Sequence, residues 1–201
     1  LVSVLLRPVG DPGGAARGRC GDWTGVGVPR TVDDGLVRAA VTFLRRDLRT
    51  IKPRLQWARD AVPGLTGRIT PPNQPGMALS VHGDAGWGRE VQRGRLPGGG
   101  GFSPDLVDAA AKAIRDRWHP APAPAWVTAV PSGSRPGLVE GFARSLAGRL
   151  DLPFVATLSV VDGAPPQASM ANSAQQLANA EARLVVDGAA VRADPVLLVD
   201  D

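Results

Sequence analysis

The stretch that decides the fold runs from residue 126 to residue 201: it opens on WVTAVPS (126–132) and closes on PVLLVDD (195–201). Between these runs lie PGLVEGFARSLAGRL (136–150), PFVATLSVV (153–161) and SAQQLANAEARL (173–184). The apolar, β-branched runs predict buried strands, and the two longer segments predict helices. Strand, helix, strand, helix, strand in this order predicts an α/β domain with a parallel sheet and right-handed crossovers.

Two polar features follow strands of this predicted sheet, at the ends where such sheets bind ligands. The turn after the first strand offers backbone N–H groups, a helix dipole and a guanidinium to a phosphate or pyrophosphate. Its candidate residues are Ser132, Gly133, Ser134 and Arg135. The second feature is the pair Asp200 and Asp201, whose carboxylates would accept hydrogen bonds from hydroxyls or hold a Mg²⁺-bound phosphate. A purely structural interpretation stays open for both, because polar turns are common and acids often end strands.

The same segment resembles the type I phosphoribosyltransferases, and within them the ComF-like proteins. The matching residues are Ala129-Val130-Pro131, Gly141-Phe142, Pro166-Gln167, Asn172, Gln175, Gln176 and Leu197–Asp201. The resemblance implies a phosphoribosyltransferase-like domain that is truncated inside its phosphate loop, with Asp200 and Asp201 facing the ribose hydroxyls. The Thr/Ser-Gly-x-Thr part of that loop, which cradles the 5′-phosphate, is not in this chain.

Residues before 126 predict a mainly helical, loop-rich α+β region. The expected division is a segment at 1–30, a helical and short-strand region at 31–97, a Gly-rich linker with a helix and a Pro-rich join at 98–125, and the α/β domain at 126–201. Only Leu1–Leu6 could form a strand in the first segment.

Two helices are expected in this region. The first spans residues 31–60, with Thr31 as N-cap and the apolar stripe Leu36, Ala40, Leu44 and Leu48, and Pro53 breaks or kinks it. The second, SPDLVDAAAKAIRDRW (103–118), has a serine cap and a proline at its first position. Gly86-Trp87-Gly88-Arg89 predicts a packed tight turn.

Charge is uneven along the chain, although its net value is +4. Residues 1–119 hold 18 Lys or Arg against 11 Asp or Glu, whereas residues 120–201 hold 5 against 8. The front part is therefore the candidate for an anionic partner such as DNA. The residues expected to contact phosphates or stack on a base are Arg45, Arg46, Arg49, Lys52, Arg54, Arg59 and Trp57. The alternative is that they form the solvated face of a helix.

A second resemblance concerns the amino-terminal part. ARGRCGDWTG (16–25) looks like a degenerate form of the Cys-rich element C-G-x-C-D-x-C-T-G of RecQ-like superfamily II DNA helicases. Residues 68–95 resemble the region that follows it in several actinobacterial members, which then carry a phosphoribosyltransferase-like tail. The resemblance implies the C-terminal region of an ATP-dependent helicase active in DNA repair, with the helicase core in the same polypeptide. Since this chain lacks G-x-x-x-x-G-K-[ST], the ATP and Mg²⁺ of that motor would bind outside it.

The departures from the Cys-rich element affect its metal. Only Cys20 is kept, and Arg17 and Trp23 stand where the element has cysteines. Because structural zinc needs four ligands, we predict no metal site there and interpret Cys20 as a lone thiol. His82 is interpreted as structural, and His119 as the end of a helix.

Three functions stay open from the sequence. The first is an accessory part of a RecQ-like helicase that contacts DNA. The second is a Mg²⁺-dependent phosphoribosyltransferase acting on a nucleobase-type substrate, and the third is a non-catalytic interaction scaffold. The pattern assigns no catalytic residue. A single Cys fits a reducing cytoplasm, and no apolar run reaches the roughly 20 residues that span a bilayer, so we expect a cytoplasmic protein without a membrane partner.

Overall fold

The computed structural model describes residues 2–5, 34–46, 48–59, 61–80, 84–96, 100–133, 135, 137–161, 163 and 165–200, with only the backbone at 2–5, 36 and 168. In chain order the elements are β1 (Val2–Leu5), α2 (Asp34–Arg46), β2 (Arg49–Ile51), β3 (Gly76–Ala78), α3 (Gly88–Gly94), α4 (Pro104–Ala113), η2 (Ile114–Trp118), β4 (Trp126–Ala129), α5 (Leu138–Leu150), β5 (Leu158–Val160), η3 (Gln167–Ser169), α6 (Ser173–Arg183), β6 (Leu184–Val186) and β7 (Val196–Asp200).

The central sheet has three strands in the order β1, β7, β4, and both pairings are parallel. Strand β7 lies beside β4 in a register that sets Ala129 opposite Val199. The parallel pairing predicted for these two runs is confirmed. The third strand, β1, comes from the opposite end of the chain and sets Leu5 opposite Asp200. The sequence predicted that strand but not its place in this sheet.

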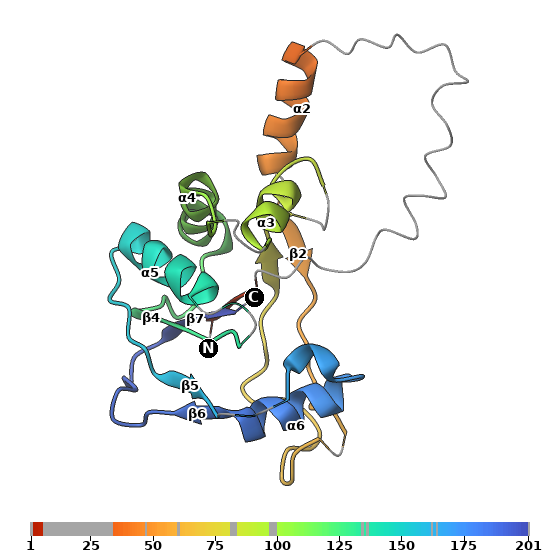
Figure 1. Ribbon diagram of the computed structural model, residues 1–201, viewed down its shortest axis with the longest axis vertical. Helices are drawn as coiled ribbons and strands as arrows, with labels where there is room; N and C mark the ends of the chain where they lie inside the picture. The colour runs from red at the N-terminus through yellow and green to blue at the C-terminus, as the bar shows by residue number, and fades with distance from the viewer. Residues whose placement is uncertain are drawn as a thin grey trace, which may run out of the picture.

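Helix α5 packs against β4 and β7, and α4 packs against α5 (Figure 1). The core that they share with β4 and β7 includes the fully buried Leu106, Leu146 and Leu197. The predicted start of α4 is confirmed, because the Ser103 hydroxyl accepts a hydrogen bond from the Leu106 N–H and Pro104 is the first helical residue. Burying each leucine contributes about 1.5–3 kcal/mol, so α4 is an integral layer of the sheet's core.

Residues 153–161 differ from the single buried strand that their composition predicts. Only Phe154 makes a parallel bridge to Val127 of β4. Strand β5 instead pairs antiparallel with β6 in a separate two-stranded sheet. Between the two, Thr157 is buried and its hydroxyl lies 3.0 Å from that of Thr128. The predicted strand–helix alternation is thus correct for β4, α5 and β7, and wrong in giving the parallel sheet a full strand between them.

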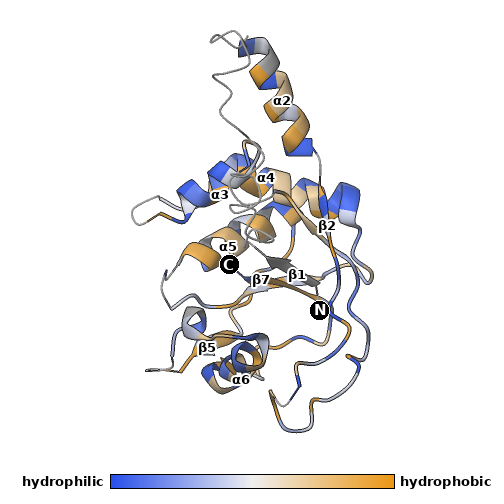
Figure 2. Cartoon of the chain, turned by 90° about the vertical axis from the view of Figure 1, so that its right-hand side faces the viewer, coloured by the Kyte–Doolittle hydropathy of each residue, from blue (hydrophilic) through white to orange (hydrophobic). Residues whose placement is uncertain are grey.

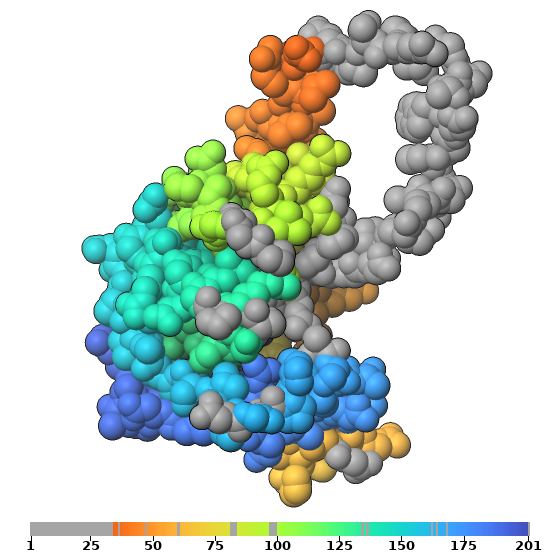
Figure 3. Space-filling view, viewed as in Figure 1, coloured from red at the N-terminus to blue at the C-terminus, as the bar shows by residue number. Residues whose placement is uncertain are grey.

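Helix α2 extends away from this body (Figures 1 and 3). It ends at Arg46, earlier than predicted, because β2 starts at Arg49 and pairs antiparallel with β3. Its apolar positions, visible in Figure 2, are largely open to solvent: Val37 is 45% exposed and Phe43 is 69% exposed. The predicted cap Thr31 lies outside the described residues.

The last turn of α2 attaches it to the body. A Cβ at position 86 would lie 3.2 Å from the Cβ of Leu44, so only glycine fits easily between α2 and the turn before α3. No helix within the described ranges is long and apolar enough to cross a membrane.

Candidate functional site

The predicted DNA-contacting residues lie along three consecutive elements and not on one helix face. Arg45 and Arg46 end α2, Arg49 begins β2, and the other members follow in an extended segment. That segment reaches α6, where the Arg54 guanidinium lies 3.4 Å from the Ser173 hydroxyl. The alternative interpretation, a solvated helix face, is therefore wrong for the residues after Arg46, because the helix ends there.

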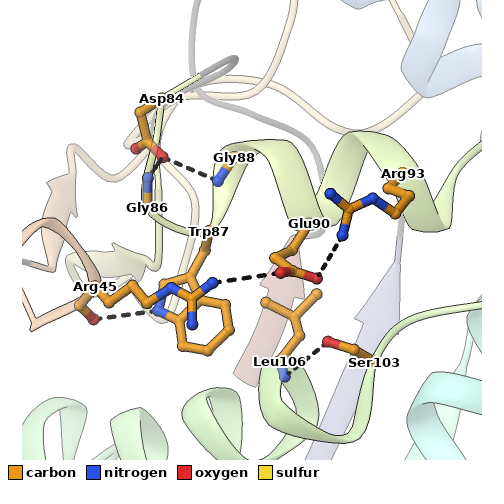
Figure 4. A network of polar contacts seen from close by, with 9 residues as sticks. All are labelled: Arg45, Asp84, Gly86, Trp87, Gly88, Glu90, Arg93, Ser103 and Leu106. Atoms are coloured by element: carbon orange, nitrogen blue, oxygen red, sulfur yellow. Dashed lines mark hydrogen bonds and ion pairs between the residues drawn. The ribbon is translucent and has the colours of Figure 1, made fainter. Parts of the chain in front are cut away.

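Arg45 belongs to a buried junction between α2 and α3 (Figure 4). Its guanidinium lies 4.3 Å from the centre of the Trp87 ring, and its Nη2 lies 3.3 Å from Oε1 of Glu90. In return the Trp87 indole N–H donates to the Arg45 carbonyl oxygen at 3.2 Å. Arg93 approaches the other oxygen of Glu90 at 3.6 Å. A cation–π contact that is partly desolvated contributes about 0.5–2 kcal/mol, so Arg45 acts mainly as an anchor for α2.

The turn that presents Trp87 is held by a carboxylate. Oδ1 of Asp84 accepts hydrogen bonds from the N–H groups of Gly86 and Gly88, each at 2.9 Å, and so fixes the start of α3 (Figure 4). Trp87 is only 7% exposed, which confirms the packed turn predicted from the sequence. His82, its predicted neighbour, lies outside the described residues.

The basic stretch therefore divides into anchored and open members. Arg54 donates to the Gln56 carbonyl oxygen at 2.9 Å, and Arg49 also has a partner. By contrast, the exposed Arg46, Lys52 and Arg59 have no hydrogen bond or ion pair with any residue that the structure describes. We call these three residues the open cations. They are the members of the predicted set that can meet phosphates without first breaking an internal contact.

Trp57 is less available for stacking than its position in the sequence predicts. It is half-buried, and its N–H donates to the Gly67 carbonyl oxygen at 3.0 Å next to a bridge between Gln56 and Arg68. This pairing folds the segment back on itself. The backbone of Trp57 is thus part of a small paired loop, and its side chain is half-buried.

The second candidate site is the carboxyl edge of the parallel sheet. The register of β4 and β7 brings Val130 beside the end of β7, where its N–H donates to the Val199 carbonyl oxygen at 2.8 Å. The turn with Ser132, Gly133 and Arg135 therefore lies at the same sheet edge as the half-buried Asp200, because β4 and β7 are neighbouring parallel strands. Ser134 and Asp201 lie outside the described residues.

The start of α5 shapes this edge. Gly137 is the N-cap with φ of +82°, a conformation that glycine adopts without strain, and no side chain caps the helix. Glu140 in the first turn is neutralised by Arg144 at 2.7 Å. The end of the helix dipole that favours anions thus faces the turn without a capping side chain.

One residue near this turn was not predicted. The guanidinium of Arg183, the last residue of α6, lies against Gly133: a Cβ there would stand 3.0 Å from its Nη2. The sequence signal for this proximity is weak, because Arg183 lies in an ordinary helical segment. The tertiary fold brings the end of α6 next to the turn.

The remaining predictions concern metals and thiols. Among the described residues, no three His, Cys, Asp or Glu side chains gather into a group that could hold a metal ion. The Cys-rich segment with Arg17, Cys20 and Trp23 lies outside those residues, as does Asp201 of the predicted Mg²⁺ pair. His119 ends η2 in a left-handed conformation with φ of 46°, which confirms it as a helix end.

Comparison with known proteins adds no relative. No protein-family profile, no curated protein and no solved structure matches this chain.

Proposed function

We propose that this chain is an accessory C-terminal part of a RecQ-like DNA helicase and that it contacts DNA through the open cations. The observation that carries this proposal is that Arg46, Lys52 and Arg59 are exposed and have no partner among the described residues. When exposed, unpaired cations contact DNA phosphates, the counterions condensed on the DNA are released. This release is the main source of sequence-independent affinity for DNA. The ATPase motor, with its ATP and Mg²⁺, lies outside this chain and the location is cytoplasmic.

The shape of the basic region supports the same function. Helix α2 extends from the body and its last turn is fixed by the Arg45, Trp87 and Glu90 junction (Figures 1 and 4). A fixed junction holds the neighbouring Arg46 in place without using its charge. The anchored Arg45 thus positions the end of α2, and the open cations can contact the nucleic acid.

A second candidate function concerns the parallel sheet, which we propose to be phosphoribosyltransferase-like. The observation that favours it is the meeting of the turn after β4 with Asp200 at one carboxyl edge. A phosphoribosyl ligand with Mg²⁺ would place its phosphates on the turn and its hydroxyls on Asp200 and Asp201. In the helicase part this fold serves binding, and in the alternative it transfers a phosphoribosyl group to a nucleobase-type substrate.

Fluorescence anisotropy tests the first function. The full chain is titrated into labelled duplex and single-stranded DNA at about 50 mM and about 200 mM salt. We expect binding that weakens steeply with salt, because each phosphate contact contributes a slope of about −0.9 for duplex DNA. An affinity that is independent of salt, or no binding, contradicts the proposal. Calorimetry with phosphoribosyl pyrophosphate and Mg²⁺ tests the second candidate, and an absence of heat of binding by the full-length protein contradicts it.

A further inference from the structure

The guanidinium of Arg183 borders the β4–α5 turn at Gly133. It approaches the turn so closely that a Cβ at position 133 would be 3.0 Å from Nη2, tighter than ordinary van der Waals contact. The backbone of Arg183 is fixed as well, because its carbonyl oxygen accepts the Val161 N–H at 2.9 Å. Gly133 thus lets a cation from α6 reach the backbone of a turn that follows β4.

One nitrogen of this guanidinium, Nε, is buried without a partner, although the residue as a whole is half-buried. Its Nε is shielded from solvent and has no acceptor within the part of the chain that the structure describes. Leaving a buried donor unpaired costs about 1–3 kcal/mol, and more on a charged group. No described carboxylate forms an ion pair with Arg183 either. No interaction among the described residues therefore offsets the cost of burying this donor.

Arg45 shows how the same chain treats a structural arginine. Its Nε is also shielded and unpaired, yet Glu90 at 3.3 Å and the Trp87 ring at 4.3 Å stabilise its charge. Arg183 has neither a carboxylate nor an aromatic ring as a described partner. Arg183 thus keeps a shielded donor that no residue within the described part of the chain satisfies.

We infer that Arg183 is a binding residue for a phosphate or pyrophosphate group seated on the β4–α5 turn. The inference rests on the second candidate function, the binding of a phosphorylated sugar at this edge. The planar guanidinium fits two phosphate oxygens at once. The Ser132 hydroxyl, the backbone of the turn and the uncapped start of α5 supply the other donors. Asp200 on the neighbouring strand favours a phosphate that carries hydroxyls or Mg²⁺ over a bare anion.

Calorimetric titration of the full chain with inorganic pyrophosphate and with ribose 5-phosphate, each with Mg²⁺, tests this role. Arg183→Gln is expected to weaken binding about tenfold or more, since hydrogen bonds to charged groups are strong. Arg183→Lys, which keeps the charge but loses the planar fork, is expected to lie between wild type and Arg183→Gln. The matched control is Arg192→Gln, an exposed arginine on the segment before β7, for which no change is expected.

A second variant keeps the test independent of folding. Gly133→Ala adds a methyl group 3.0 Å from Nη2, so the guanidinium has to shift by a few tenths of an ångström, and we expect a small loss of pyrophosphate affinity with the Arg183 side chain intact. Wild-type affinity in both Arg183→Gln and Gly133→Ala overturns the inference. If Arg135→Gln removes binding and Arg183→Gln does not, the turn binds phosphate without Arg183 and the inference is wrong. If the wild type binds neither probe, both the inference and the second candidate function are wrong. Loss of DNA affinity in Arg183→Gln without loss of pyrophosphate affinity also overturns the inference.

Discussion

Apolar side chains are buried in the body, which is formed by β4, β7, α4 and α5. They are largely exposed on the projecting helix α2. Leu146 of α5 is fully buried, whereas Phe43 of α2 is 69% exposed. Both helices have an apolar stripe in sequence, so the stripe alone does not decide whether a helix is packed. The body is held by burial, and α2 is held by the polar and aromatic junction at its last turn. Stability of the two regions should therefore respond to different substitutions.

The largest effect is expected in the body. Leu146→Ala removes a fully buried side chain between α5 and the sheet, and we expect the free energy of unfolding to fall by about 2–5 kcal/mol. Urea denaturation followed by circular dichroism measures this change. Leu96→Ala, at a leucine that is 62% exposed, is the control and should change stability by less than about 0.5 kcal/mol. Equal effects of both substitutions contradict the assignment of the core.

A smaller effect is expected at the junction. Glu90→Gln removes the charge that Arg45 and Arg93 share, and leaves the partly buried Arg45 without its ion pair. We expect a loss of about 1–2 kcal/mol, together with faster amide hydrogen exchange in α2 than in α5. Glu140→Gln breaks the exposed pair with Arg144 and should cost about 0–0.5 kcal/mol. Unchanged exchange in α2 in the Glu90 variant argues against the anchor.

The smallest effect is expected in the projecting helix α2. Phe43→Ser removes an aromatic side chain that is mostly in water already, so the free energy of unfolding should change by less than about 0.5 kcal/mol. Thermal unfolding of this variant beside Leu146→Ala gives the contrast directly. A loss comparable to that of Leu146→Ala requires a packing partner for α2 that the described residues do not supply.

Much of the body could be predicted from local patterns. Ser103 and Pro104 mark the start of α4, and two apolar runs ending at the turn and at Asp200 give β4 and β7. Their adjacency in the sheet does not follow from local pattern, because α5, β5, η3, α6 and β6 lie between them in the chain. The sequence placed Ser132, Gly133 and Asp200 after strands, and the pairing of β4 with β7 sets them at one edge of the sheet.

The rest depends on contacts distant in sequence. The run at 153–161 has the composition of a strand, but composition does not determine which strand it pairs with. Its second half, β5, pairs with β6. Helix α2 ends early because β3 offers Arg49–Ile51 a pairing that helical propensity does not reveal. Whether a basic residue is anchored likewise depends on Glu90 for Arg45 and on Ser173 for Arg54. Arg183 was missed for the same reason.

The most direct test of the DNA-contact proposal compares two charge-matched variants of the full chain. One replaces the open cations (Arg46→Gln, Lys52→Gln, Arg59→Gln), and the other replaces three exposed arginines elsewhere (Arg115→Gln, Arg144→Gln, Arg192→Gln). Both remove three positive charges, so a nonspecific effect of net charge is the same in each. The measurement is the slope of the logarithm of the duplex-DNA binding constant against the logarithm of the salt concentration. We predict that the first variant flattens the slope by up to about 2.7 and that the second leaves it close to wild type. Equal slopes in the two variants would contradict the proposal.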